Sequence, residues 1–422
     1  MIEFEMPKPI AQQSYVLQTV AENMMRPVSR YFDEHEHEIP WDYINFMHMA
    51  MRATGAGSLA PPAEKKKEGE ETEEKKETEK RPPIGYQMLA FMLEMLSWGD
   101  VGIYLCTPGG GLGAAAVEAA GTPEQKQKFL ARFREEKPVF AAMAMTEPHC
   151  GSDTSAIRTT AVLDKNTNEW VLNGEKIFVT AGQKSLEESN GFVVVWATID
   201  PSAGRAGMRS FVVEAGTPGV KVTKLEHKMG IRASDTASIV LQDARVPFEN
   251  ILGSPEVQPD TSKGFKGAMA TFDATRPLVA ATGVGVARAT VELVKELLAK
   301  QGIEIRYGLP RSKLTNIERE IIDMEVMLRS AWLLVIKAVW MADNRKPNPL
   351  EASMAKLRAG DVVTKITQRA LELMGPIGYS RDTLLEKWFR DAKITDIYEG
   401  TGQINRLVVA RNILGYTGRE LR

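Results

Sequence analysis

One carboxylate stands out near the end of the chain, in the stretch RDAKITDIYEGTGQINR at residues 390–406. Glu399 lies between Tyr398 and a Gly-Thr-Gly run, although the surrounding sequence has the apolar spacing of helices. A carboxylate can accept hydrogen bonds or exchange a proton, and glycine gives the backbone unusual freedom to present it. The plain alternative is a solvated loop acid beside Arg406, so the interpretation depends on what the rest of the chain provides.

Hydroxyl groups gather in a second stretch, AMAMTEPHCGSDTSAI at residues 141–156. The polar side chains there are Thr146, Glu147, Ser152, Asp153, Thr154 and Ser155. Hydroxyls and backbone amides at the lip of a β unit suit hydrogen bonding to a polar ring edge or to phosphate oxygens. A turn capped by serine and aspartate is the plainer interpretation. Phe178 and Thr180, two residues apart, would share one face of a strand, either against a flat cofactor or in the core.

Composition narrows the function classes. The 422 residues carry a net charge of -2 and no evident basic face, so nucleic-acid binding has no electrostatic support. Cys106 and Cys150 are the only cysteines, which excludes a disulfide framework and suits a reducing compartment. Neither a signal peptide nor an apolar run of about 18 residues is evident, so we expect a cytoplasmic protein without a membrane span. The five histidines are scattered, and no metal site is expected.

The order of apolar patterns predicts an α+β fold in three parts. Residues 1–140 form an N-terminal helical domain. It is interrupted at 61–83 by a charged segment without large apolar side chains, which we expect to be a mobile surface insertion, with partner binding as the alternative. Residues 141–255 show short alternating runs between turn residues, typical of an antiparallel β-domain. Residues 256–422 return to long helical periodicity.

Two glycine-rich stretches imitate nucleotide-binding motifs. GGGLGA at 109–114 fits the loose dinucleotide fingerprint, and VGIYLCT at 101–107 before it has the composition of a strand. No second βα unit follows, so a Rossmann site is disfavoured. GVGVA at 283–287 lies within a helical pattern, where it predicts a small-residue face for close helix packing.

Several short motifs occur along the chain in a recognisable order. They are TEPHCGSD at 146–153, LNGEKIFVTAG at 172–182, MGIRASDT at 229–236, VPFENILG at 246–253, LLEKWFRDAKITDIYEGTGQINR at 384–406 and VVARNIL at 408–414. Together they resemble the acyl-CoA dehydrogenase family from about residue 85 onward, and residues 272–285 are most similar to its short- and medium-chain members. The resemblance implies a helical N-terminal domain, a middle β-domain and a C-terminal four-helix-bundle-like domain, assembled as a homotetramer or dimer.

The resemblance also implies an activity. FAD would lie between the middle and C-terminal domains, with an acyl-CoA thioester against the flavin ring. Glu399 would abstract the α-proton while the β-hydride passes to flavin N5, giving the trans-2-enoyl-CoA, and electron-transfer flavoprotein would accept the electrons. A carboxylate on a Gly-rich segment can bring both its side chain and its backbone N–H to one substrate. The alternatives are an enoyl-CoA reductase or acyl-CoA oxidase on the same fold, or a flavin-free assembly partner.

Binding residues follow from the resemblance position by position. The residues at cofactor positions are Met143, Thr146, Ser152, Phe178, Thr180, Arg306, Gly375, Thr401 and Gln403. The residues at substrate positions are Ser152, Asp273, Arg276 and Gly400. Phe178 stands where a tryptophan is usual. Thr275 stands where some branched- and long-chain members keep their catalytic glutamate, so Glu399 has no rival base.

Two of the family's cofactor motifs are altered. EIRYG at 304–308 places Glu304 where the family has an arginine that reaches the flavin pyrophosphate of a neighbouring subunit, and ELMGP at 372–376 places Glu372 and Pro376 where glutamine and glycine are usual. A carboxylate near a pyrophosphate is repulsive, so we predict looser FAD binding unless Arg306 compensates. His149 and Cys150 also replace small residues, either for packing or for contact with the flavin.

Overall fold

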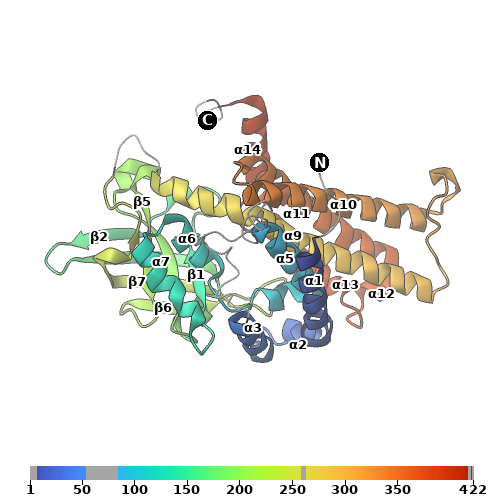
Figure 1. The fold of residues 1–422 in the computed structure, drawn as a ribbon, viewed down its shortest axis with the longest axis horizontal. Helices are drawn as coiled ribbons and strands as arrows, with labels where there is room; N and C mark the ends of the chain where they lie inside the picture. The colour runs from blue at the N-terminus through green and yellow to red at the C-terminus, as the bar shows by residue number, and fades with distance from the viewer. Residues whose placement is uncertain (1–6, 54–83, 258–262, 417–419, 421–422) are drawn as a thin grey trace, which may run out of the picture.

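The computed structural model describes residues 7–53, 84–257, 263–416 and 420, without the side chains of 263–273. The charged segment at 61–83 lies outside the described residues. Figure 1 shows a β-sheet at one end of the molecule and long helices at the other, with the N-terminal helices along one side. The three-part α+β fold expected from the sequence is therefore confirmed.

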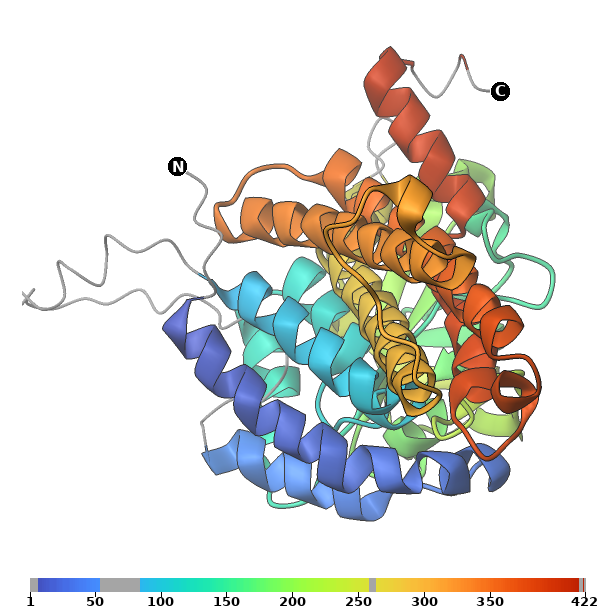
Figure 2. The same cartoon turned by 90° about the vertical axis from the view of Figure 1, so that its right-hand side faces the viewer.

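The N-terminal part is helical. Its helices are α1 (Lys8–Val20), α2 (Ser29–Glu34), α3 (Trp41–Ala53), α5 (Gly85–Tyr104), α6 (Gly111–Ala120) and α7 (Pro123–Leu130). The apolar faces of α1, α3 and α5 meet in one buried cluster that includes Leu17, Ile44 and Leu96, which is the packing expected of amphipathic helices. Figure 2 shows α1 to α3 in blue along one edge of the molecule.

The glycine-rich stretch before α6 does not follow a strand. Of the preceding residues, 101–104 end α5 and 105–106 form a turn, and Gly111–Ala120 is α6 itself. A Cβ atom added to Gly113 would lie only 2.7 Å from the Ala141 carbonyl carbon. These glycines therefore allow α6 to pack closely against the first strand, and they do not form a dinucleotide fingerprint.

The middle part is one sheet of eight strands. The strands are β1 (Ala141–Ala144), β2 (Thr160–Asp164), β3 (Glu169–Thr180), β4 (Phe192–Thr198), β5 (Met208–Glu214), β6 (Val220–Leu225), β7 (Thr236–Pro247) and β8 (Ile251–Leu252), with the short helix α8 (Gly182–Leu186) between β3 and β4. The main order is β6-β7-β3-β2-β4-β5-β8, and β1 pairs with β4.

The sheet is mixed, and the expectation of a purely antiparallel unit was wrong in this respect. Four consecutive residues of β1 pair in parallel with β4, and Thr160 of β2 bridges in parallel to Thr198 of β4. Parallel neighbours require a long connection between them. The β2–β3 hairpin and α8 provide that connection, and an alternating apolar pattern in each strand does not reveal it.

The C-terminal part is again helical. Its helices are α9 (Lys263–Lys300), α10 (Asn316–Asp343), α11 (Pro349–Met374), α12 (Pro376–Tyr379), α13 (Leu385–Ala392) and α14 (Gly402–Leu414). Short helical turns elsewhere are η1 (Ala21–Met25), η2 (Arg26–Val28), η3 (Ala131–Arg134), η4 (Thr154–Ala156), η5 (Pro201–Gly207), η6 (Phe248–Asn250), η7 (Arg311–Lys313) and η8 (Lys393–Asp396). Helices α5, α9, α10 and α11 pack against one another around the largest apolar cluster.

Helix α9 lies at the centre of this packing. A Cβ atom on Gly285 would come within 2.2 Å of the Glu94 carbonyl oxygen, so the small residues at 283–287 do allow close packing against α5, as predicted. The segment Ala274–Lys300 is also long and apolar enough to cross a membrane by composition. However, 78% of its most apolar window is buried inside the protein, as in the core helix of a globular domain.

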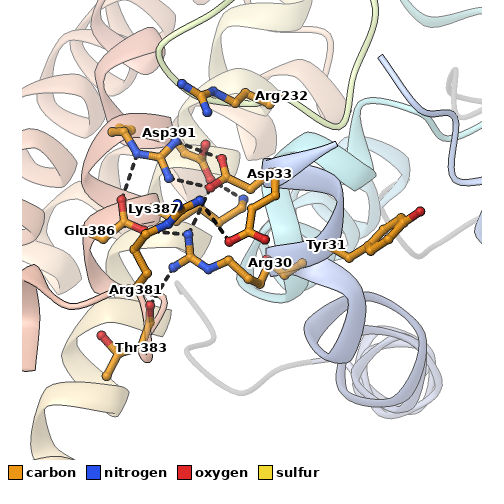
Figure 3. Close-up of polar contacts among 12 residues, drawn as sticks. Arg30, Tyr31, Asp33, Arg232, Arg381, Thr383, Glu386, Lys387 and Asp391 are labelled. Atoms are coloured by element: carbon orange, nitrogen blue, oxygen red, sulfur yellow. Dashed lines mark hydrogen bonds and ion pairs between the residues drawn. The ribbon is translucent and has the colours of Figure 1, made fainter. Parts of the chain in front are cut away.

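A network of charged residues joins the N-terminal and C-terminal helices (Figure 3). Arg390 of α13 reaches both carboxylate oxygens of Asp33 in α2, at 2.8 and 2.5 Å. Beside this pair, the buried Lys387 ammonium lies 2.7 Å from Asp100 in α5 and 2.6 Å from Asp391. The two carboxylates outweigh the effect of burial and raise the pKa of Lys387, so it stays charged. The network therefore fixes α13, and with it the start of the 390–406 stretch, against α2 and α5.

Candidate active site

A cavity of about 2400 Å³ lies where the three parts of the molecule meet. Its wall includes residues from α5 and α6, from the ends of β1 and β3, from α9, and from the segment before α14. The site residues expected from the sequence that line it are Met143, Thr146, Ser152, Phe178, Thr180, Arg276, Glu399, Gly400 and Thr401. Nine positions that are scattered over 259 residues of sequence thus share one cavity, although their individual roles stay predictions.

Glu399 is held at the cavity wall by its backbone and by a neighbouring hydroxyl. Its φ is +52° and that of Gly400 is +95°, so both residues adopt the left-handed conformation that glycine favours. The hydroxyl of Thr275 in α9 donates a hydrogen bond of 2.6 Å to Glu399 Oε2. Arg406 instead bonds Asp361 at 3.0 Å, so the interpretation of Glu399 as a loop acid beside Arg406 was wrong.

The electrostatic surroundings of Glu399 favour a carboxyl group that can hold a proton. Burial raises the pKa of Glu399 above its ordinary value, while the Thr275 hydrogen bond and the positive charges of Lys356 and Arg276 counteract part of that effect. A carboxylate with a raised pKa in a cavity is a common arrangement for a general base or acid.

Two buried side chains hold the segment that carries Glu399. Lys356 of α11 donates to the Gly400 carbonyl at 3.1 Å, and Asn405 of α14 donates to the same oxygen at 2.8 Å. Thr401 caps α14 by accepting a hydrogen bond from the Ile404 backbone N–H. The sequence interpretation did not identify Lys356, Asn405 or the contact of Thr275. A lysine at a core-facing register of α11 was the one available signal.

The loop after β1 combines a rigid support with an exposed polar lip. The Glu147 carboxylate accepts hydrogen bonds from the backbone of Arg158 and Thr159, at 2.7 and 3.0 Å, and lies 2.7 Å from the Lys176 ammonium. Asp153 caps the turn by accepting from the Ser155 backbone N–H. The interpretation as a capped turn is therefore confirmed. Thr146 and Ser152 also line the cavity, and their hydrogen bonding to a ligand stays a prediction.

Phe178 occupies a strained position in β3 that faces the cavity. Its φ is +56°, its side chain is 59% exposed, and the register of β3 against β7 shifts between Lys176 and Val179. A β-bulge of this kind re-aims a side chain, and strain of this kind is frequent at binding sites. An exposed aromatic ring near the Thr180 hydroxyl suits a flat heteroaromatic ligand. The volume of the cavity and the hydroxyl groups that line it, such as that of Thr180, fit FAD.

Three expected cofactor residues do not line the cavity. Arg306 follows α9 and donates hydrogen bonds to both carboxylate oxygens of Glu318, at 2.7 and 2.8 Å. Gly375 ends α11, and Gln403 is exposed in the first turn of α14. Their proposed contacts with FAD stay predictions, and so does that of Asp273, whose side chain lies outside those described. Compensation by Arg306 would require breaking its pair with Glu318.

Cys150 belongs to an apolar cluster with Met145, Ile157, Trp196 and Met208. It is 8% exposed and is not among the residues of the cavity wall, while the His149 ring bonds the Ala156 carbonyl at 2.8 Å. These contacts favour the packing interpretation for both residues. In the described part of the chain, two groups each bring three potential metal-ligating residues together, so the expected absence of a metal site stays a prediction. The groups are Glu36, His37 and His227, and Glu147, His149 and Cys150.

Comparisons with known proteins place these motifs in context. The family model described as acyl-CoA dehydrogenase, middle domain, matches residues 142–244, and the one described as acyl-CoA dehydrogenase, C-terminal domain, matches residues 262–414. Acryloyl-CoA reductase (NADH) of Anaerotignum propionicum is 38% identical over 320 residues, which is 76% of either chain.

Solved structures share the whole fold. Butyryl-CoA dehydrogenase from Megasphaera elsdenii is 30% identical with a TM-score of 0.79, and the match covers 98% of this chain and 100% of that one. A chain from the structural study of the electron transferring flavoprotein of Acidaminococcus fermentans is 31% identical, also with a TM-score of 0.79, and the same shares of the two chains match.

Proposed function

The chain belongs to the acyl-CoA dehydrogenase family, and from this premise we propose that it oxidises an acyl-CoA thioester to the trans-2-enoyl-CoA. The observation that carries the proposal is the carboxylate of Glu399, which lines the cavity, accepts a hydrogen bond from Thr275 and has a pKa raised by burial. Such a group can take a proton from a weakly acidic carbon.

Glu399, its backbone N–H and Thr275 have different roles in the removal of the α-proton. Glu399 takes the α-proton, and the left-handed backbone at residues 399 and 400 allows its own N–H to face the same substrate. A backbone N–H aimed at the thioester oxygen would stabilise the negative charge that develops there. Thr275 fixes the carboxylate orientation, because its hydroxyl bonds only one of the two carboxylate oxygens.

FAD is the cofactor that we propose for the cavity. When bound, it supplies the acceptor for the β-hydride. Its ring system would contact Phe178 and the hydroxyls of Thr146, Thr180 and Thr401, while Ser152 and Arg276 would bind the acyl-CoA side. We assign FAD to this chain because an exposed aromatic ring with several hydroxyls around it suits a flat ring with polar edges.

The relative named acryloyl-CoA reductase favours one alternative direction. In a reductase the same carboxyl group would deliver a proton to the α-carbon, so a raised pKa serves both directions. The names of two similar proteins refer to acryloyl and butyryl groups. We therefore propose a short acyl chain as the first substrate class to test, in either direction.

We also propose that the enzyme assembles as a homotetramer or dimer in the cytoplasm and passes electrons to an electron-transfer flavoprotein. The likeness to a chain from the flavoprotein study supports the choice of acceptor. Figures 1 and 2 show α14 standing out from the rest of the molecule. Apolar side chains are exposed on α14 and α10, which supports assembly: Ile413 at 61%, Leu414 at 58%, Val326 at 62% and Leu333 at 57%.

The test is the visible spectrum of the purified protein during anaerobic addition of acyl-CoA thioesters, starting with butyryl-CoA. We expect a flavin band that bleaches with one acyl length, and a Glu399→Gln variant that keeps the band without bleaching. If Glu399→Gln still bleaches, Glu399 is not the base. A protein that stays colourless after addition of FAD would refute the enzyme and favour the assembly partner, whereas oxygen uptake would identify an oxidase.

A further inference from the structure

Lys356 is a buried lysine with an unusual partner. It lies on α11 with 1% of its surface exposed, and its ammonium donates to the Gly400 carbonyl, 44 residues away in sequence. Burial lowers the pKa of Lys356 to about 8, and the negative charges of Glu399 and Asp396 prevent a larger decrease. A buried lysine costs free energy unless it is compensated. The compensating groups are the Gly400 carbonyl and the carboxylates of Glu399 and Asp396, which ties the lysine to the segment that carries Glu399.

The segment that Lys356 holds is strained. A non-glycine residue with positive φ costs about 1–3 kcal/mol and persists only where its surroundings fix it. Glu399 is such a residue, with φ of +52°. The carbonyl of the next residue, Gly400, accepts hydrogen bonds from both Lys356 and Asn405, at 3.1 and 2.8 Å. Two donors on one oxygen fix the Gly400–Thr401 peptide, one residue beyond Glu399.

Lys356 and Asn405 differ in charge, so comparing them separates the effect of the hydrogen bond from the effect of the positive charge. Asn405 is neutral and fully buried, so it acts on the segment only through its hydrogen bonds to the Gly400 and Thr401 carbonyls. Lys356 brings the same kind of hydrogen bond together with a positive charge that lowers the pKa of Glu399. The described groups that act electrostatically on or with Glu399 are Thr275 and Arg276 of α9, Lys356 of α11, Tyr104 of α5 and the adjacent Tyr398.

We propose that Lys356 is a positioning residue for the base: it fixes the Gly400–Thr401 peptide, next to Glu399, through the Gly400 carbonyl, and its positive charge favours the ionised form of the Glu399 carboxylate. The proposal rests on the proposed function of Glu399 as the base. It adds that α11 contributes to the ionisation of Glu399, together with the Thr275 hydrogen bond and in opposition to the burial that raises its pKa. Arg276 contributes in the same direction from the opposite helix.

The experiment compares Lys356→Met, Lys356→Arg and Asn405→Leu with the wild-type holoenzyme. Infrared difference spectra over a pH titration follow the protonated-carboxyl band of Glu399, identified as the band that Glu399→Gln lacks. Removing the positive charge that acts on Glu399 should raise the midpoint in Lys356→Met by about one pH unit. Lys356→Arg and Asn405→Leu should keep the wild-type midpoint, because the first retains the charge and the second removes only a neutral donor.

An unchanged midpoint in Lys356→Met overturns the electrostatic role of Lys356. A midpoint shift in Asn405→Leu equal to that in Lys356→Met also overturns it, because displacement of the segment would then explain both shifts. Lys356→Gln replaces the methionine variant if circular dichroism shows that the latter does not fold. The rate of anaerobic flavin bleaching with butyryl-CoA is measured in parallel, and we expect Lys356→Arg to rescue most of the loss seen in Lys356→Met. A wild-type protein that no acyl-CoA bleaches refutes the proposed function, whereas the infrared titration still decides the role of Lys356.

Discussion

The hydrogen bond from Thr275 to Glu399 offers the sharpest test of how the site tunes its base. Thr275→Val keeps the size and β-branching of the side chain and removes the hydroxyl that lies 2.6 Å from Glu399 Oε2. That hydrogen bond favours the ionised form, so its loss should raise the pKa of Glu399 further. The acid limb of the rate profile should therefore move to higher pH.

The magnitude follows from the energy of a hydrogen bond to a charged group. Such a bond contributes about 1.5–3 kcal/mol, and one pKa unit corresponds to about 1.4 kcal/mol. Because Glu399 is only half-buried, solvent replaces part of the lost interaction, and we expect the lower end of the range. The midpoint should rise by about one unit, so the rate below both midpoints should fall about 10-fold.

The assay is anaerobic stopped-flow reduction of the bound flavin by the acyl-CoA that bleaches the wild type, measured across the acid limb. Thr282→Val is the matched control, because this threonine lies two turns further along α9 and bonds the Val279 carbonyl and the Tyr398 hydroxyl. We expect its midpoint to stay within a few tenths of a unit of the wild type. Identical midpoints for both valine variants would show that Thr275 does not act on the ionisation of Glu399.

Three further outcomes are expected. Because burial raises the pKa of Glu399, the folded protein binds this proton more tightly than the unfolded chain. Wild-type stability should therefore decrease as pH rises through the folded pKa, and Glu399→Gln should remove that decrease in thermal unfolding; parallel curves would contradict the assignment. Lys387→Met leaves two buried carboxylates without their cation and should cost about 3–5 kcal/mol in urea unfolding, whereas Lys300→Met, in an exposed pair, should change little. Glu304→Arg should slow FAD loss during dialysis, and unchanged retention would refute the idea that Glu304 repels the cofactor.

The sequence was sufficient for much of the fold because local patterns carry it. The alternating runs at 169–180 and 236–247 became β3 and β7, and the helical periodicity after residue 262 became α9 to α14. The parallel pairing of β1 with β4 was not predictable in this way, since the register between strands depends on which connection lies between them. The composition of VGIYLCT at 101–107 was also compatible with a strand, but its first four residues end α5, where Val101 packs in the cluster with α9 and Ile103 in the cluster with α1 and α3.

The same division applies to the candidate site. The sequence by itself determined that a carboxylate would sit on a glycine-rich segment, and that hydroxyls and an aromatic ring would be available from the middle domain. Only the tertiary structure decided what controls that carboxylate. The Thr275 contact joins residues 124 positions apart, and the Lys356 contact joins residues 44 positions apart. Both contacts arise from the way in which α9 and α11 pack around the 399–401 segment, because a hydrogen bond depends on distances of about 3 Å that no spacing along the chain specifies.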